Sequence, residues 1–120
     1  MKKILIIALI QLCVMVNAQL YPDSNNDGKY YTINGKKIWV VTLGKGNPLV
    51  LISGGPGIPH IPLRDFDSLS ASSTLIYFDA LGRGKSDTAA TISEYTLARD
   101  IEEVESLRKV LGYPKIDVPG

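Results

Sequence analysis

Residues 48–57 read PLVLISGGPG, and they hold the main sequence signals of the architecture. Its first half is a short, continuous apolar run, which is typical of a strand buried on both faces in a parallel sheet. Its second half holds three glycines in five residues, so the backbone turns sharply and its N–H groups stay uncovered. Such N–H groups at the top of a sheet can stabilise a developing oxyanion. A tight turn without a chemical role is an equally good interpretation, because Gly-Pro pairs are common in turns.

The flanking segments predict strands and a helix. A second apolar run at 73–79 (STLIYFD) predicts another buried strand, and residues 59–70 leave room for a short crossover helix between the two strands. Upstream, residues 30–41 (YYTINGKKIWVV) contain two β-rich runs joined by Asn34-Gly35. This pair is preferred in two-residue hairpin turns, so we expect a β-hairpin before the parallel strands.

A longer helix and a third strand follow. Residues 97–111 carry five apolar side chains at helical spacing, which predicts an amphipathic helix. The five are Leu97, Ile101, Val104, Leu107 and Leu111. Thr96 can cap the start of this helix and Gly112 can end it. Residues 115–118 (KIDV) then predict a third buried strand. The order of hairpin, strand, helix, strand, helix and strand indicates an α/β fold with a mostly parallel sheet.

The second loop, residues 77–87 (YFDALGRGKSD), contains a GKS motif at 84–86. A phosphate-binding loop needs a glycine five positions before that motif, but Asp79 stands there, and its charge would repel phosphate. We interpret Asp79 as an organiser of the loop that accepts hydrogen bonds from the N–H groups of the following turn. A catalytic acid is the less favoured role. Gly82 and Gly84 allow unusual φ angles in the same turn.

The N-terminus predicts a secretory signal peptide at 1–18. Two lysines precede an apolar stretch that is too short to span a membrane, and the stretch ends in a small-residue pattern at Ala18. Cys13, the only cysteine, would leave with this peptide. We therefore divide the chain into the signal peptide, a lead-in at 19–28 and a partial domain at 29–120. We expect an exported product, periplasmic or extracellular, with no stable membrane anchor after cleavage.

Composition excludes other classes of protein. Hydrophobic residues make up 45% of the chain and charged residues 21%, a globular rather than a disordered balance. The net charge of +1 gives no basic surface for nucleic acid. The sequence also implies no metal and no cofactor.

Together, the motifs resemble the N-terminal part of an α/β-hydrolase. LVLISGGPG (49–57) is followed by YFDALGRGKSD (77–87) and YTLARDIEEVESLRKVLGYPKIDV (95–118), in fitting order and at fitting distances. Within this superfamily the two loops resemble those of the proline iminopeptidases of the serine peptidase type, which read H-G-G-P-G and D-Q-x-G-x-G-x-S. The double glycine before Pro56 favours this branch of the superfamily.

The resemblance implies an oxyanion loop formed by Gly54, Gly55, Pro56 and Gly57. In the family, the second glycine donates one N–H to the oxyanion, and here that residue is Gly55. The other donor follows the nucleophile. We hypothesise that the Gly55–Pro56 bond is cis, because proline in a tight turn permits it.

The resemblance also implies that the chain is truncated before the nucleophile elbow, G-x-S-x-G. Gly120 would be the first glycine of this motif, with the nucleophilic serine just beyond it, so no catalytic residue lies in the chain. Ser53 and Ser86 are not elbow serines, and we assign them to the structure of the two loops. His60 precedes the elbow, where the family has no catalytic base, so we expect a surface or loop-packing histidine.

The implied function is that of an exported serine hydrolase that releases N-terminal proline from peptides. The sequence departs from the family pattern at two positions, and these departures bear on the substrate class. Ser53 replaces the usual histidine of the first loop, and Ala80 replaces the usual glutamine of the second. The alternatives are an esterase or epoxide-hydrolase-like enzyme of the same fold, a non-catalytic truncated product, or a secreted binding module. The expected binding partner of the complete enzyme is a peptide or another small-molecule substrate.

Overall fold

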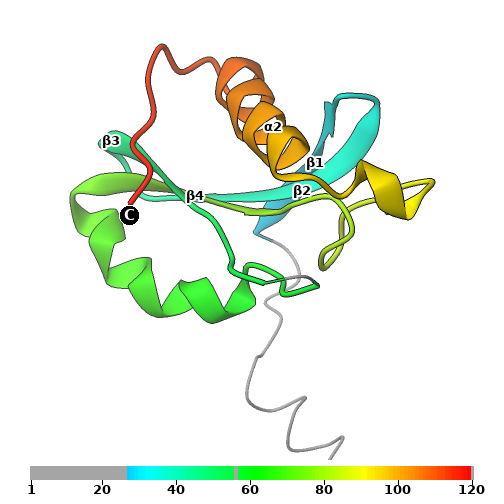
Figure 1. Ribbon diagram of the computed structural model, residues 1–120. Helices are drawn as coiled ribbons and strands as arrows, with labels where there is room; N and C mark the ends of the chain where they lie inside the picture. The colour runs from blue at the N-terminus through cyan, green and yellow to red at the C-terminus, as the bar shows by residue number, and fades with distance from the viewer. Residues whose placement is uncertain (1–26, 56, 120) are drawn as a thin grey trace, which may run out of the picture.

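The computed structural model describes residues 27–55 and 57–119. The predictions that lie outside the described residues are the signal peptide at 1–18, most of the lead-in at 19–28, the Gly55–Pro56 bond and the elbow glycine Gly120. The described part contains a sheet with helices on both sides (Figure 1).

The first two strands form the predicted hairpin. β1 (Gly28–Ile33) pairs in antiparallel fashion with β2 (Lys36–Leu43). Asn34 and Gly35 make the turn with φ angles of 49° and 77°. Asparagine and glycine are the residues that adopt this left-handed region most readily, so the hairpin prediction is confirmed together with its physical reason.

The next two strands complete a sheet with the order β1-β2-β4-β3. β3 (Asn47–Leu51) runs parallel to β4 (Ser73–Asp79), whereas β4 runs antiparallel to β2. The described sheet is therefore mixed rather than mostly parallel, because the hairpin contributes two of its four strands. β4 lies inside the sheet and is buried from Thr74 to Asp79, which explains its continuous apolar sequence.

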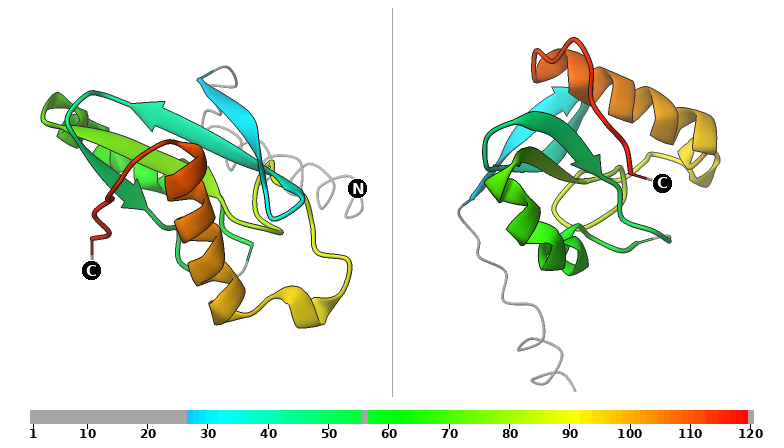
Figure 2. Two further views of the ribbon diagram at one scale, coloured as in Figure 1. Left: turned by 90° about the horizontal axis from the view of Figure 1, so that it is seen from above. Right: turned by 90° about the vertical axis from the view of Figure 1, so that its left-hand side faces the viewer.

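Helices cover both faces of the sheet (Figure 2). η1 (Ile61–Ala71) is a 3-10 helix that connects β3 to β4 and lies on one face, and α2 (Leu97–Val110) lies on the other. The predicted crossover helix is thus present as the tighter 3-10 form. The sequence did not predict η2 (Ile92–Glu94), a short turn before α2, in which Glu94 accepts the Thr91 N–H at 3.1 Å.

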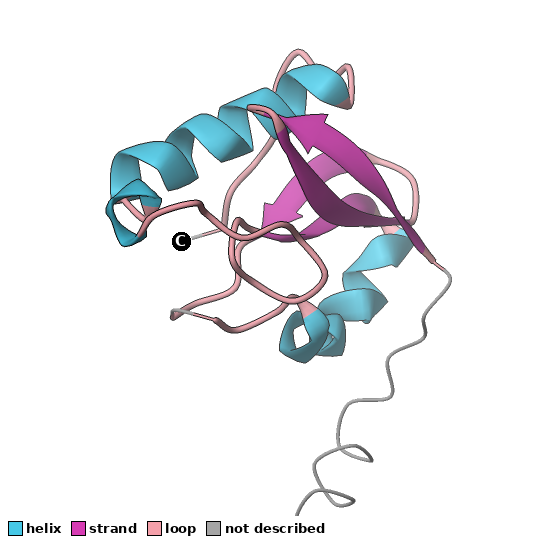
Figure 3. Ribbon diagram, turned by 90° about the vertical axis from the view of Figure 1, so that its right-hand side faces the viewer, coloured by secondary structure: helices cyan, strands magenta, loops and turns pink. Residues whose placement is uncertain are grey.

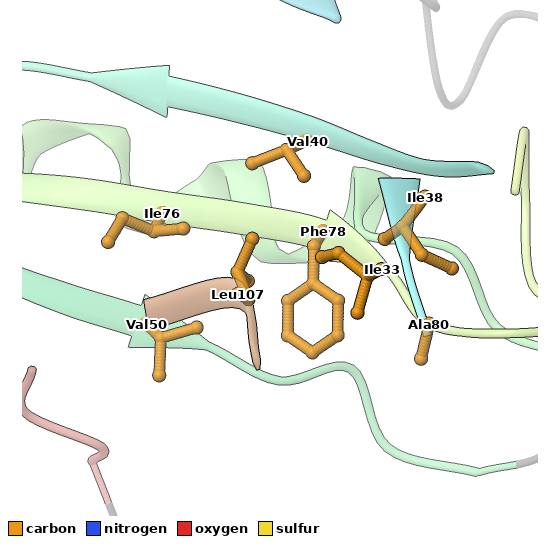
Figure 4. Packing of buried hydrophobic residues seen from close by; sticks show 8 residues of the cluster. All are labelled: Ile33, Ile38, Val40, Val50, Ile76, Phe78, Ala80 and Leu107. Atoms are coloured by element: carbon orange, nitrogen blue, oxygen red, sulfur yellow. The ribbon is translucent and has the colours of Figure 1, made fainter. Parts of the chain in front are cut away.

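An apolar cluster lies on each face of the sheet. The cluster beneath α2 is drawn in Figure 4 and consists of Ile33, Ile38, Val40, Val50, Ile76, Phe78, Ala80 and Leu107. The cluster beneath η1 consists of Trp39, Val41, Leu51, Leu75 and Tyr77. Neighbouring residues of one strand, such as Val40 and Val41, belong to different clusters because strand side chains alternate between the two faces.

The helix α2 is bounded as predicted, but only part of its apolar stripe is buried. The Thr96 hydroxyl accepts the Arg99 N–H at 3.2 Å, and Gly112 follows the helix with a φ of 78°. Leu107 is fully buried, whereas Leu97 and Ile101 are 76% and 61% exposed. The stripe therefore contributes to the core chiefly through its C-terminal half.

The segment 115–118 pairs as predicted but is not buried. It makes a single parallel bridge, between Asp117 and Leu49, with Asp117 donating to Pro48 O and accepting from Val50 N at 2.9 Å each. Val118 is 53% exposed. The prediction of a buried strand is wrong for the described residues, because among them nothing packs over both sides of this segment.

We expect the substitution Leu107→Ala to destabilise the fold by about 2–5 kcal/mol, because it removes a fully buried side chain and leaves a cavity beneath α2. Leu97→Ala is the matched control on the same helix, and since Leu97 is 76% exposed it should change stability by no more than about 0.5 kcal/mol. Urea denaturation of both variants checks this, and equal losses would contradict the packing described here.

Candidate functional site

Two loops leave the carboxyl ends of the parallel strands β3 and β4. The glycine loop, residues 52–60, follows β3, and the second loop, residues 80–87, follows β4; both are drawn in pink in Figure 3. Because parallel neighbours end at the same edge of a sheet, the two loops meet there. In open α/β sheets this edge is where ligands bind.

The glycine loop is closed by one side chain at its start. The hydroxyl of Ser53, which is buried, donates to the carbonyl of Ile58 at 2.9 Å. Between them, Gly55 and Gly57 have φ angles of 77° and 75°, which side chains rarely tolerate. Gly54 and Gly55 are exposed. The loop therefore presents bare backbone to solvent while its base is fixed.

Asp79 lies where the two loops meet. Its Oδ1 accepts the His60 backbone N–H at 2.7 Å and lies 2.8 Å from His60 Nδ1, and its Oδ2 accepts the Lys85 N–H at 3.0 Å. The ring nitrogen Nδ1 carries the hydrogen in this contact, since a carboxylate only accepts. Asp79 is 1% exposed and His60 3% exposed. One buried carboxylate thus binds the glycine loop and the second loop at once.

Burial alone would raise the pKa of the Asp79 carboxyl. The hydrogen bonds from the His60 ring, the Lys85 N–H and the His60 N–H outweigh that effect and hold the pKa below its ordinary value. Asp79 is therefore a carboxylate at neutral pH and acts as an acceptor. A general acid would need a raised pKa, so this environment does not suit the role of catalytic acid.

The second loop is also fixed to β2. The Ser86 hydroxyl donates to the Asp79 carbonyl and accepts the Trp39 N–H at 2.8 Å. Lys85 Nζ lies 4.6 Å from the centre of the Trp39 ring, a cation–π distance. Ser86 therefore has a structural partner on each side.

The second loop requires glycine at two positions, because their φ angles are positive and because no space is left there for a side chain. A Cβ on Gly84, whose φ is 48°, would overlap the Asp79 carboxylate. A Cβ on Gly82, whose φ is 75°, would lie 2.5 Å from the Tyr95 hydroxyl oxygen. Both positions bring backbone into close contact with a polar side chain, so the loop cannot carry larger residues there.

Glu103 of α2 is a site residue that the sequence analysis missed. It is 3% exposed, and both of its carboxylate oxygens lie 3.2 Å from the Leu81 nitrogen, which donates to them. Burial raises the pKa of Glu103, and the Leu81 N–H offsets only part of this effect. On sequence, Glu103 was one of several charges assigned to a solvated helix face, and its place one turn before Leu107 was the local signal that could have separated it from Glu102.

The position of His60 was only partly anticipated. It packs within the loops, as one of the two expected alternatives stated, but it is buried and bound to Asp79 rather than on the surface. A usable signal was present in the sequence: His60 follows the first parallel strand and Asp79 ends the second, so both lie at the same edge of the sheet.

A groove of about 830 Å³ opens beside the glycine loop. Gly55 lies at one end of it, and its apolar walls come from the sheet, from α2 and from the C-terminal segment. These walls are Ile52, Phe78, Leu97, Ile101, Val104, Ile116 and Val118. A smaller hollow of about 490 Å³ shares Gly55 and continues toward Tyr95. Gly55 of the glycine loop therefore lines both hollows.

Among the described residues, the groups available for chemistry at this edge are the backbone N–H groups of the glycine loop, which can donate hydrogen bonds. His60 is bound to Asp79 as in a triad, but the hydroxyls of Ser53 and Ser86 donate to backbone carbonyls rather than to His60, so these residues do not form a serine–histidine–aspartate triad. Residues 27–55 and 57–119 contain no group of three or more His, Cys, Asp or Glu side chains that could hold a metal ion. None of the helices in these ranges is both long enough and apolar enough to span a membrane.

Comparison with solved structures identifies the fold. The proline iminopeptidase-related protein of Thermus thermophilus matches with a TM-score of 0.71 and 23% identity, over 76% of this chain and 34% of that one. The epoxide hydrolase CorEH matches with a TM-score of 0.70 and 32% identity, over 76% of this chain and 31% of that one. The described residues have the N-terminal part of the α/β-hydrolase fold.

Comparison of sequences identifies individual relatives of the chain. The chain is 38% identical over 79 residues to the proline iminopeptidase of Chitinophaga pinensis, covering 62% of this chain and 26% of that protein. It is 38% identical over 81 residues to the proline iminopeptidase of Saccharolobus solfataricus, covering 64% and 26%. Human (Lyso)-N-acylphosphatidylethanolamine lipase is 34% identical over 93 residues, covering 72% and 27%. No family model matches the sequence.

The chain thus resembles the proline iminopeptidases and, beside them, other hydrolases of the same fold. It spans 26% of the length of the first two curated relatives and 27% of the third. The sequence-based resemblance to the N-terminal part of an α/β-hydrolase is confirmed.

We expect Gly84→Ala to destabilise the fold more than Gly112→Ala does. Both glycines have positive φ angles, but a Cβ meets the Asp79 carboxylate only at Gly84, and nothing lies within 4 Å at Gly112. The control should cost about 1–2 kcal/mol for backbone strain, and Gly84→Ala should cost that amount and more. Thermal unfolding of the two variants makes the comparison; equal losses would show that the carboxylate moves aside freely.

The buried Glu103 should make stability depend on pH. Because its pKa is raised in the folded state, its contribution is most favourable below the unfolded value of about 4.3 and is lost as pH rises through the folded pKa. Glu103→Gln keeps an acceptor for Leu81 N–H without a charge. Its stability relative to the wild type should therefore increase between about pH 4 and pH 7.

Urea denaturation across that pH range measures the effect. Glu102→Gln, at an exposed position one residue earlier on α2, is the control and should follow the wild-type pH dependence. Parallel curves for Glu103→Gln and the wild type would rule out a buried charge at this position.

Proposed function

We propose that this chain forms the N-terminal part of an exported serine hydrolase that releases N-terminal proline from peptides. The observation that carries the proposal is the exposed glycine loop at the carboxyl end of β3, whose backbone is fixed at its base and faces a groove. Preorganised N–H groups of this kind stabilise an oxyanion without reorganisation during the reaction. In this proposal Gly55 supplies one of the two donors.

The proposed reaction needs residues that follow Gly120 in the longer relatives. A serine hydroxyl adds to the carbonyl carbon of the N-terminal residue, and its proton passes to a histidine that an aspartate orients. The carbonyl oxygen takes the negative charge next to Gly55 N–H. When the C–N bond breaks, the histidine returns the proton to the leaving amine, and water then releases proline from the serine by the same steps.

The substrate class is proposed from two features. The sequence has the double glycine before Pro56 that the resemblance associates with iminopeptidases, and the first two curated relatives are proline iminopeptidases. An ester or epoxide substrate is the second candidate, since a lipase and an epoxide hydrolase are also similar to the chain. No metal or cofactor takes part in either proposal.

Export is proposed from the N-terminal residues 1–18, whose two lysines, apolar stretch and small-residue end are typical of a signal peptide. The released product would work in the periplasm or outside the cell. A non-catalytic product, such as a secreted binding module, is the alternative that applies if residues 1–120 act alone.

The test begins with the codons that follow Gly120. We expect an elbow serine two codons further on, and we expect the corresponding longer product to hydrolyse a proline arylamide faster than a leucine arylamide or a phenyl ester. Gly55→Ala should lower kcat about 100-fold, because a Cβ at a φ of 77° and 3.1 Å from Ile58 Cδ1 displaces the donor. Gly112→Ala, far from the loop and also at positive φ, is the control.

Three results would overturn parts of the proposal. An elbow aspartate with epoxide turnover would replace the aminopeptidase by the epoxide-hydrolase alternative. Faster ester than arylamide turnover would favour an esterase. A stop codon with no elbow in any frame would leave a non-catalytic chain.

A further inference from the structure

The glycine loop contains two consecutive glycines, Gly54 and Gly55, which are both exposed. Glycine has the greatest backbone freedom of all residues, so the direction of the Gly55 N–H depends on how the ends of the loop are held. The first end is held where Ser53 bonds Ile58. The second end is at His60.

His60 is held by two contacts to one oxygen. Its backbone N–H and its ring Nδ1 lie 2.7 Å and 2.8 Å from Asp79 Oδ1, so both the main chain and the side chain are oriented by the same carboxylate. Asp79 in turn accepts the Lys85 N–H through Oδ2. The ring of His60 also lies 6.2 Å from the ring of Tyr77, centre to centre.

Ile58 links this end of the loop to Gly55. Its carbonyl accepts the Ser53 hydroxyl at 2.9 Å, and its Cδ1 lies 3.1 Å from the position that a Cβ on Gly55 would take. Ile58 precedes His60 by two residues, so a shift of His60 is passed along the main chain to the residue that closes the loop on Ser53 and lies beside Gly55. Asp79 is thus linked to Gly55 through His60 and the short segment 58–60.

We infer that His60 is a positioning residue, which acts through Asp79 and Ile58 to set the direction of the Gly55 N–H. The inference rests on the proposed role of Gly55 as an oxyanion donor. Like the histidine of a triad, His60 binds a carboxylate through Nδ1, but its side chain is only 4% exposed, and the hydroxyls of Ser53 and Ser86 bond backbone carbonyls instead of its ring. Its burial, and the lack of a serine partner among the described residues, distinguish it from a catalytic histidine.

The test compares two variants of the full chain, which differ in whether the side chain at position 60 has a hydrogen-bond donor. His60→Asn places an amide N–H close to where Nδ1 stands and keeps the hydrogen bond to Asp79. His60→Leu is similar in size but removes the donor. Both keep the backbone N–H contact. The ¹⁵N order parameters of Gly55 and Gly57 report the loop, and those of Val40 and Ile76 report the core.

The wild type and His60→Asn should have loop order parameters near about 0.85, typical of rigid backbone, and His60→Leu should fall below about 0.6. Core values should stay near about 0.85 in all three chains. The inference is overturned if His60→Leu keeps a rigid loop, if the wild-type loop is already mobile, or if His60→Asn loosens as much as His60→Leu. None of these readings depends on turnover, so they are separate from a failure of the proposed activity.

A second measurement covers the case in which His60→Leu does not fold. In the wild type, the Gly55 amide shift and the Asp79 carboxyl ¹³C shift are followed as pH falls. Since the pKa of Asp79 is held low, both should change together below about pH 4, with one midpoint. The His60 ring and the backbone N–H groups of Lys85 and His60 lower the pKa of Asp79, and Glu103 faces the second loop from α2. A Gly55 midpoint unrelated to that of Asp79 would overturn the inference.

Discussion

The buried carboxylate of Asp79 is the contact on which the functional edge of the sheet depends. It ends β4 and accepts N–H groups from the glycine loop and from the second loop. It reaches both because β3 and β4 are parallel neighbours, with their carboxyl ends at the same edge. A residue at the carboxyl end of β2 could not do this, since β2 runs antiparallel to β4 and ends at the opposite edge. The topology therefore makes one side chain sufficient to join two loops.

Besides Asp79, the helix α2 also supports the second loop. Leu107 fixes this helix to the apolar cluster, and Glu103, one turn earlier, accepts the Leu81 N–H. The same helix thus contributes Leu107 to the core and holds the loop that carries Gly82 and Gly84. A shift of α2 would reach the loop through a buried hydrogen bond rather than through flexible chain. Burial of the Glu103 charge opposes this contact, and the Leu81 N–H offsets part of the cost.

Much of the fold could be predicted because its signals are local. Asn34-Gly35 fixed the hairpin through φ alone, and the apolar run at 73–79 identified an inner strand. The residues missed were those whose role depends on distant partners. Glu103 is buried because Leu81 lies opposite it, and His60 is buried because Asp79 ends the neighbouring strand. Burial at 115–118 was overestimated, since the sequence of a segment does not say what covers it.

One consequence follows from the surroundings of Trp39, the only tryptophan of the chain. Its backbone N–H is bound to Ser86, the Lys85 ammonium lies over its ring, and the Tyr30 ring meets it edge-on at 4.9 Å. The indole is therefore in direct contact with the second loop and nearly enclosed. Its ultraviolet emission forms a built-in optical reporter of that loop, which senses the separation of the loop from β2 without any attached dye.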